Sequence, residues 1–288
     1  MSDILHGDKE SKLQIEMGKD NKKVKNYLSF SPPNAKIDFY SFNLPAGFTC
    51  PGAKDCLSKA DKLTGKITDG IHNKFRCFAA TAEMIFPAVR TQRHSNFEIL
   101  IALKTESAMA SELIKAFYKQ VPIKHRAVFR LHVSGDFFNA EYFKAWMAVA
   151  VHFPNTLFYA YTKSVNLFAV NKNNLPSNFN IVASNGGNYD NLIESENLRY
   201  ATVVFSEAEA ENYSLSDYWK QILGRNKGLP IDHDDSHAYN SKEPFALLLH
   251  GQQKKGTESA KALSLLGGQS GKSSYNRNKK KHAIALTA

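Results

Sequence analysis

The sequence predicts an α/β fold that is (β/α) barrel-like, a full or incomplete TIM barrel with an N-terminal arm and a basic C-terminal tail. Short β-rich runs alternate with helical stretches from residue 96 onward. This alternation favours a parallel sheet, because each parallel pair of strands needs a crossover. Five of the runs begin apolar and end in polar side chains, as barrel strands do at the edge that carries the active site. An open, doubly wound sheet is the second interpretation.

Composition divides the chain into three parts. Residues 1–26 are polar, show little apolar periodicity and form the arm. Residues 27–251 form the barrel-like domain, and residues 252–288 form a basic, flexible tail. Within the domain, residues 27–44 alternate aromatic and polar side chains around a Pro-Pro turn, which predicts a hairpin or a strand leading into the body.

The remaining elements follow from residue type and spacing. β-rich composition predicts strands at residues 127–133, 156–162, 178–184, 199–206 and 245–251. Helical spacing predicts helices at residues 96–103, 111–120, 165–175 and 215–223. Another helix is expected after Asn139, a suitable N-cap, because the apolar residues that follow it fall on one face: Tyr142, Trp146, Val149 and Ala150.

The net charge of +10 is concentrated at the C-terminus. Residues 252–288 hold eight Lys or Arg and one acid, Glu258, so the preceding residues carry only +3. The body therefore lacks a bulk basic footprint for nucleic acid, which leaves a local patch as an alternative, and a weak nucleic-acid contact is expected through the tail. No apolar run reaches the roughly 18 residues of a membrane helix, and the N-terminus is charged. We expect no membrane association and a cytoplasmic protein.

Three cysteines, Cys50, Cys56 and Cys77, lie within 28 residues, and the remaining sequence has none. The Gly/Pro-rich loop around the first two turns repeatedly and exposes N–H groups to sulfur, as metal-thiolate sites require. Structural zinc normally takes four protein ligands, so three thiolates fit a [4Fe-4S] cluster better, with an open or non-cysteine fourth position. Three buried free thiols are the alternative.

Several blocks resemble the bacteriophage gene product 88 family. They are LPAGFTCPGAKDC, RCFAA, HVSGDFFNAEYFKAW, FYAYTKS and VASNGG, spread over roughly residues 40–250. The resemblance implies a phage-encoded iron-sulfur protein on a barrel scaffold, with Cys50, Cys56 and Cys77 as cluster ligands. It also implies that the S-G-D and Y-T-K-S blocks face the same cavity. The resemblance supplies no biochemical activity.

Polar residues at the strand ends are the candidate catalytic groups. His132, Ser134 and Asp136 alternate at the end of one strand and share one side, from which they could orient or protonate a bound molecule. Asp136 could equally cap the next helix. Lys163 brings a cation to the same rim, or is an ordinary solvated lysine.

Weaker candidates follow the later strands. Ser184 and Asn185 open a Gly-Gly turn whose N–H groups could face an anion, and His250 ends the last apolar run. We expect Ser184, Asn185 and His250 to contact the cofactor. The alternatives are an ordinary Gly-Gly turn and a histidine whose hydrogen bonds are satisfied in the core. The run Asp232–His237 reads as a solvated acidic loop, with metal binding as a minor alternative.

The sequence thus predicts an iron-sulfur protein that is a redox or Lewis-acid enzyme with an unknown small-molecule or redox partner. In that interpretation the side chains of His132, Asp136 and Lys163 support an open iron. The alternative is a zinc-containing nucleic-acid-binding protein that uses the basic tail.

Overall fold

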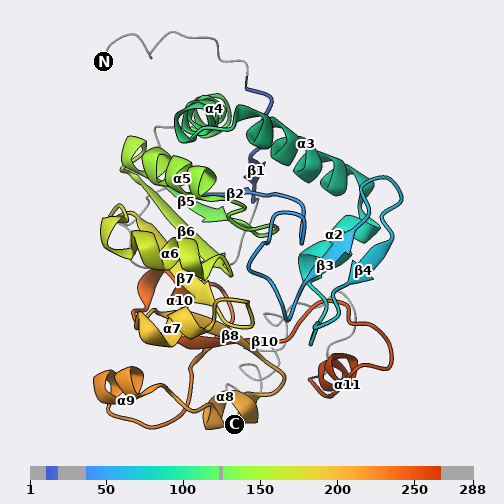
Figure 1. Ribbon diagram of the computed structural model, residues 1–288, viewed down its shortest axis with the longest axis vertical. Helices are drawn as coiled ribbons and strands as arrows, with labels where there is room; N and C mark the ends of the chain where they lie inside the picture. Colours follow the sequence, from blue (N-terminus) through green and yellow to red (C-terminus); the bar gives the residue numbers. More distant parts are fainter. Residues whose placement is uncertain (1–10, 19–36, 123–125, 267–288) are drawn as a thin grey trace, which may run out of the picture.

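The computed structural model describes residues 11–18, 37–122 and 126–266. Within them an eight-stranded sheet curls into a half-barrel, and helices line its outer side (Figure 1). The strand order is β1-β2-β5-β6-β7-β8-β10-β9. The bounds are β1 (Glu16–Met17), β2 (Ile37–Phe42), β5 (Arg126–Leu131), β6 (Thr156–Thr162), β7 (Phe179–Ser184), β8 (Tyr200–Val204), β9 (Ile231–Asp232) and β10 (Phe245–Leu248). A separate antiparallel pair is formed by β3 (Ser58–Ala60) and β4 (Ile67–Asp69).

The strand ladder confirms a barrel-like α/β fold. Strands β2, β5, β6, β7, β8 and β10 pair in parallel with their neighbours, and β9 adds in parallel to β10. Only β1 runs antiparallel, against β2. Among the described residues β1 and β9 are the two edges of the sheet and do not pair with each other, so the sheet ends as a half-barrel.

Helices connect the strands. Their bounds are α2 (Phe78–Ile85), α3 (Pro87–Leu103), α4 (Glu106–Gln120), α5 (Ala140–His152), α6 (Val165–Asn171), α7 (Asn191–Ser195), α8 (Glu207–Asn212), α9 (Asp217–Leu223), α10 (Ser236–Asn240) and α11 (Glu258–Leu265), with a 3-10 turn η2 at Lys172–Asn174. Asn139 caps α5 as expected, because its side chain accepts the Tyr142 N–H. Helix α3 starts earlier than its spacing suggested, since Pro87 occupies its first turn, where a missing N–H costs nothing.

Alternation along the central strands explains why the sheet is buried on both faces. On β5, Phe129 and Leu131 pack into the main core under the helices, whereas Val128 packs into a smaller cluster on the opposite face. On β6, Phe158 and Tyr159 divide in the same way. The opposite face is covered by α10, whose Ala238 and Tyr239 complete that cluster. Apolar side chains on both sides of a strand are typical of parallel sheets.

The described part of the expected arm, residues 11–18, also packs on the body. Leu13 is buried in the main core, and the N–H groups of Gln14 and Ile15 donate to the side chains of Asn96 on α3 and Gln120 on α4. Residues 1–10 and 19–36, which hold the rest of the expected arm and the start of the expected hairpin, lie outside the described residues, as does the basic tail from residue 267. Among the helices that the structure describes, none combines the length and apolar character needed to cross a bilayer.

Candidate functional site

The carboxylate of Asp136 joins the ends of β5 and β6. Its Oδ1 accepts hydrogen bonds from the Thr162 hydroxyl at 2.6 Å and the Phe137 N–H at 2.7 Å. Its Oδ2 accepts from the N–H groups of Lys163 at 2.7 Å and Ser164 at 3.2 Å. Burial raises the pKa of Asp136 to about 6, against the opposing effect of these donors. Asp136 therefore ties two strand ends together, and the cap of α5 is left to Asn139.

Lys163 makes the equivalent link from β6 to β7. Its ammonium donates to the Ser184 hydroxyl at 3.0 Å, the Ser184 carbonyl at 3.2 Å and the Asn185 carbonyl at 2.5 Å. An ammonium has three N–H donors, so these acceptors use its full capacity. The side chain is buried, which excludes the solvated lysine considered as an alternative.

Ser134 contacts a residue that sequence reasoning missed. Its hydroxyl donates to Glu83 Oε1 at 2.8 Å, and the same oxygen accepts from the Ala46 N–H at 3.0 Å and from Arg93 Nη1 at 2.9 Å. Glu83 is completely buried on α2, and its Oε2 has no hydrogen-bond partner. The signal that could have found Glu83 is a single acid in the otherwise apolar run FAATAEMI.

His132 lies just beyond β5, where the backbone takes a left-handed conformation with φ of 61°. Its Nε2 is 3.0 Å from the Tyr142 hydroxyl, and its ring packs edge-on against Phe137. Burial, together with the positive charge of Arg130, lowers the pKa of His132 to about 3. The imidazole is therefore neutral. Its hydrogen-bond partner is Tyr142 on helix α5.

The loop that carries Cys50 and Cys56 packs closely on these strand ends. A Cβ added to Gly52 would lie 1.9 Å from the Lys163 carbonyl oxygen, so only glycine permits this approach. On the other side the Gly52 carbonyl accepts the Asn188 N–H at 2.8 Å, and the Asp55 N–H donates to the Gly186 carbonyl at 2.9 Å. The cysteine loop is therefore held between the loops that follow β6 and β7.

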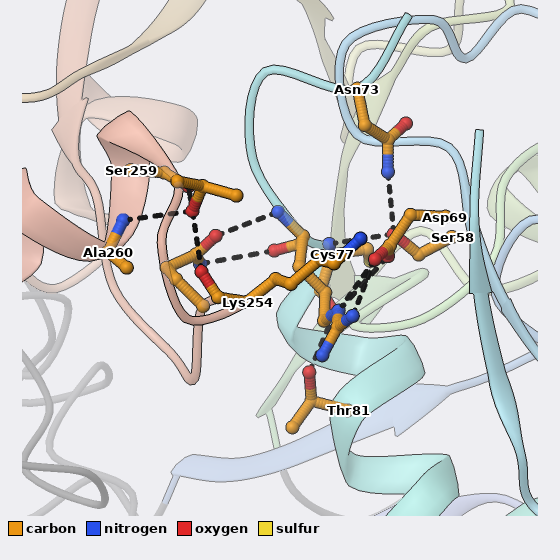
Figure 2. Close-up of polar contacts among 11 residues, drawn as sticks. Ser58, Asp69, Asn73, Cys77, Thr81, Lys254, Ser259 and Ala260 are labelled. Carbon is orange, nitrogen blue, oxygen red and sulfur yellow. Dashed lines mark hydrogen bonds and ion pairs between the residues drawn. The ribbon is translucent and has the colours of Figure 1, made fainter. Parts of the chain in front are cut away.

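The segment around Cys77 is fixed by the β3–β4 pair, as Figure 2 shows. Ser58 Oγ accepts the Cys77 N–H at 3.3 Å and the Asn73 amide at 2.9 Å, and it donates to Asp69 at 2.9 Å. Asp69 in turn pairs with Arg76. Cys77 is the N-cap residue of α2, and the Thr81 hydroxyl donates to its carbonyl. These contacts place the third cysteine at a helix terminus.

His250 and the segment after it close over the start of α2. The His250 ring lies 4.7 Å from the Phe78 ring, and Gln253 accepts the Arg76 N–H at 2.8 Å and donates to its carbonyl at 3.3 Å. His250 thus packs on the first residue of α2, beside the Cys77 segment.

The three cysteines do not assemble into the expected metal site. Within the described ranges no three His, Cys, Asp or Glu side chains form a group that could hold a metal ion. Cys50 Sγ accepts the Gly47 N–H at 3.3 Å, burial followed by the charge of Asp136 raises its pKa, and burial raises that of Cys77 to about 12. Because no such group forms, the iron-sulfur function predicted from Cys50, Cys56 and Cys77 is wrong, and so is its zinc alternative.

The run Asp232–His237 is not the solvated loop that its composition suggested. Asp235 is buried, and its carboxylate accepts from Arg130 at 2.7 Å, from Tyr159 at 2.9 Å and from Tyr161 at 3.4 Å. The reason is tertiary, because β5 and β6 present these three side chains on the face that α10 covers. The run forms no metal group either, among the residues that can be placed.

Asn185 connects the strand ends to a cleft of about 250 Å³. Its carbonyl accepts from Lys163, and its side-chain amide donates to the Tyr213 hydroxyl at 2.9 Å. The N–H groups of Gly186 and Gly187, suggested above for an anion, both donate to Asp190 at 2.9 Å. The cleft is lined by Asn185, Asp190, Ile193, Glu194, Tyr200, Tyr213, Ser214, Leu215 and Ser216.

Comparison with known proteins places the chain among phage proteins. The model of the family described as Gene product 88 matches residues 9–268. The chain belongs to the gene product 88 family. Two similar family proteins, the Gene 88 proteins of Mycobacterium phages D29 and L5, are each 28% identical over 207 residues. The match covers 67% of this chain in both cases, and 78% and 79% of the two relatives. No solved structure matches the chain significantly.

Membership of the gene product 88 family confirms the resemblance but not the activity attached to it. The names of the two relatives give a gene number and no activity. The prediction of an iron-sulfur redox or Lewis-acid enzyme is corrected by the absence of a metal-binding group among the described side chains. The zinc-containing nucleic-acid-binding alternative fails for the same reason, and the basic part of the tail beyond residue 266 lies outside the described residues.

Proposed function

We propose that this gene product 88 protein binds a small polar molecule in the cleft beside the carboxyl ends of β7 and β8. The observation that carries the proposal is the position of Asn185, which directly follows β7 and lines a cleft of about 250 Å³. In parallel α/β sheets, ligands bind outside the carboxyl ends of the strands. Treating the half-barrel as an incomplete TIM barrel leads to the same edge.

In this proposal the strand-end residues support the ligand site and do not contact the ligand. The Lys163 ammonium donates to two oxygens of Ser184 and to the Asn185 carbonyl. These hydrogen bonds hold the loop that forms one wall of the cleft. Asp136 holds the backbone of Lys163 in turn. The chain of contacts from Asp136 through Lys163 to Asn185 fixes the geometry of that wall, which is what a binding site needs from its supporting residues.

The test is binding of small molecules to the full chain, with the cleft open or blocked. Ser214 is an exposed lining residue, so Ser214→Trp fills the cleft. The matched control is Ser107→Trp, which places the same side chain at an exposed position on α4. A library of polar metabolites is screened by ligand-detected NMR. We expect compounds that bind the wild type and Ser107→Trp but not Ser214→Trp. Absence of any such compound, or equal binding to Ser214→Trp, would overturn the proposal.

A further inference from the structure

The cleft described above has a one-sided charge. Its lining holds two carboxylates, Asp190 and Glu194, and no Lys, Arg or His side chain. A nearby cation, Lys74, pairs with Asp55 at 2.8 Å and is largely exposed. The hydrogen bond that Lys74 donates to Asp55 raises the pKa of Lys74, and the charge of Asp190 adds to the shift. Lys74 is therefore engaged beside the cleft and is not part of its lining.

The Asp190 carboxylate is held in place by backbone. Its Oδ2 accepts the Gly186 N–H and its Oδ1 accepts the Gly187 N–H, each at 2.9 Å. Each carboxylate oxygen can accept more than one hydrogen bond, so Asp190 keeps acceptor capacity for a donor in the cleft. Glu194 is exposed at the start of α7, and both acids belong to the same lining.

Two phenol rings form the other wall. Tyr200 is buried and Tyr213 half-buried, and their ring centroids lie 6.2 Å apart at an interplanar angle of 46°. The Tyr213 hydroxyl is already engaged by Asn185. Burial raises the pKa of Tyr213, and the negative charge of Asp190 contributes to the rise. Aromatic faces attract cations, so these rings and the carboxylates favour the same kind of ligand.

We propose that the ligand of this cleft is an organic cation, an amine whose N–H groups donate to Asp190 and Glu194 while its carbon chain packs on Tyr200 and Tyr213. This inference rests on the proposed function and names its ligand class. An anion would meet two carboxylates with no cation in the lining to offset them. A metal ion would lack a sufficient ligand set among the described side chains.

The experiment compares three probes of equal chain length and different charge: putrescine, butanediol and succinate. Binding to the full chain is measured by titration calorimetry at low and high salt. We expect putrescine alone to bind, with an affinity that falls with salt, because its partners are partly exposed. Glu194→Gln keeps the shape of the side chain and removes its charge, and should weaken putrescine binding about tenfold. Glu141→Gln, at an exposed first-turn acid of α5, is the matched control and should change nothing.

The outcomes separate this inference from the proposal beneath it. If butanediol or succinate binds, and Ser214→Trp abolishes that binding, the cleft is a ligand site but the cation inference is wrong. Putrescine binding that Glu194→Gln leaves unchanged, or that Ser214→Trp leaves unchanged, also overturns the inference. If putrescine fails to bind, the inference falls, whereas the proposed function falls only when the metabolite library yields no ligand that Ser214→Trp excludes.

Discussion

Two buried carboxylates, one at the carboxyl edge of the sheet and one on a face of it, are stabilised in different ways. Asp136, at the carboxyl ends of β5 and β6, accepts three backbone N–H groups and one hydroxyl, with no cation among these donors. Asp235, on the face covered by α10, accepts from Arg130 at 2.7 Å and from two tyrosine hydroxyls. The first carboxylate is solvated by dipoles and the second by an opposite charge.

This difference indicates where the stability of the fold should depend on pH. Dipoles do not fully offset burial at Asp136, whose pKa rises to about 6. At Arg130 burial lowers the pKa, but the charge of Asp235, followed by Tyr159 and Tyr161, more than offsets this and raises it overall. The pair therefore depends on both partners being present, whereas Asp136 depends on pH.

The largest expected effect comes from separating the ion pair. Asp235→Ala leaves the buried Arg130 guanidinium without its carboxylate, so the free energy of unfolding should fall by about 3–5 kcal/mol in urea titrations. The double variant Asp235→Ala, Arg130→Met removes both charges and should recover part of the loss. A single variant within about 1 kcal/mol of wild type would show that the pair does not hold α10 to the sheet.

Asp136→Asn should lower the free energy of unfolding by a smaller amount, about 1–3 kcal/mol, because the new amide N–H₂ would face groups that are themselves hydrogen-bond donors. The folded-state pKa of about 6 exceeds the ordinary aspartate value of 3.8, so the protonation of Asp136 stabilises the fold fully below pH 4. That stability is lost as pH rises through about 6, by up to about 3 kcal/mol. The gap between wild type and variant should therefore narrow from pH 4 to pH 7. Parallel pH profiles would contradict the raised pKa.

Gly52→Ala tests whether the carboxyl edge depends on backbone contact as much as on Asp136. The added Cβ would meet the Lys163 carbonyl at 1.9 Å, and the cysteine loop would have to move, at a cost of about 1–3 kcal/mol. Gly224→Ala is the control, because a Cβ there meets nothing within 4 Å, although its φ of 64° carries a penalty of about 1 kcal/mol. Equal melting temperatures for the two variants would show that the close approach at Gly52 is not required.

The smallest effect is expected at His237, near Asp235. Its Nδ1 lies 3.7 Å from Asp232 Oδ1, and the interaction with Asp232 raises its pKa. Stability from the charged imidazole is fully present below pH 6.5 and is lost as pH rises through the folded-state pKa. His237→Gln should flatten this dependence by less than about 1 kcal/mol in unfolding measured from pH 5.5 to 8.5. An unchanged slope would indicate that the pair contributes nothing.

The positions of five strands along the chain and the polar groups at their ends could be predicted, because both depend on local residue type. Lys163 and Asn185 do lie at neighbouring strand ends, as their positions after apolar runs indicated. Burial of Asp235 could not be predicted, since its partners Arg130 and Tyr159 lie 105 and 76 residues away. The same limit applies to Glu83, whose contact with Ser134 spans 51 residues. The cysteine spacing misled because nearness in sequence does not by itself assemble side chains into a metal-binding group, and none forms among the described residues.

The two open edges of the half-barrel determine whether other copies of the protein could add a strand to the sheet. Within the described part of the chain the edge strands β1 and β9 are two residues long each. An open sheet offers unpaired N–H and C=O groups along its outer strands, and long edges recruit strands from other molecules. Here an incoming strand would find only two residues of regular backbone on either side. A sheet that does not close can therefore remain open without becoming a template for strand addition.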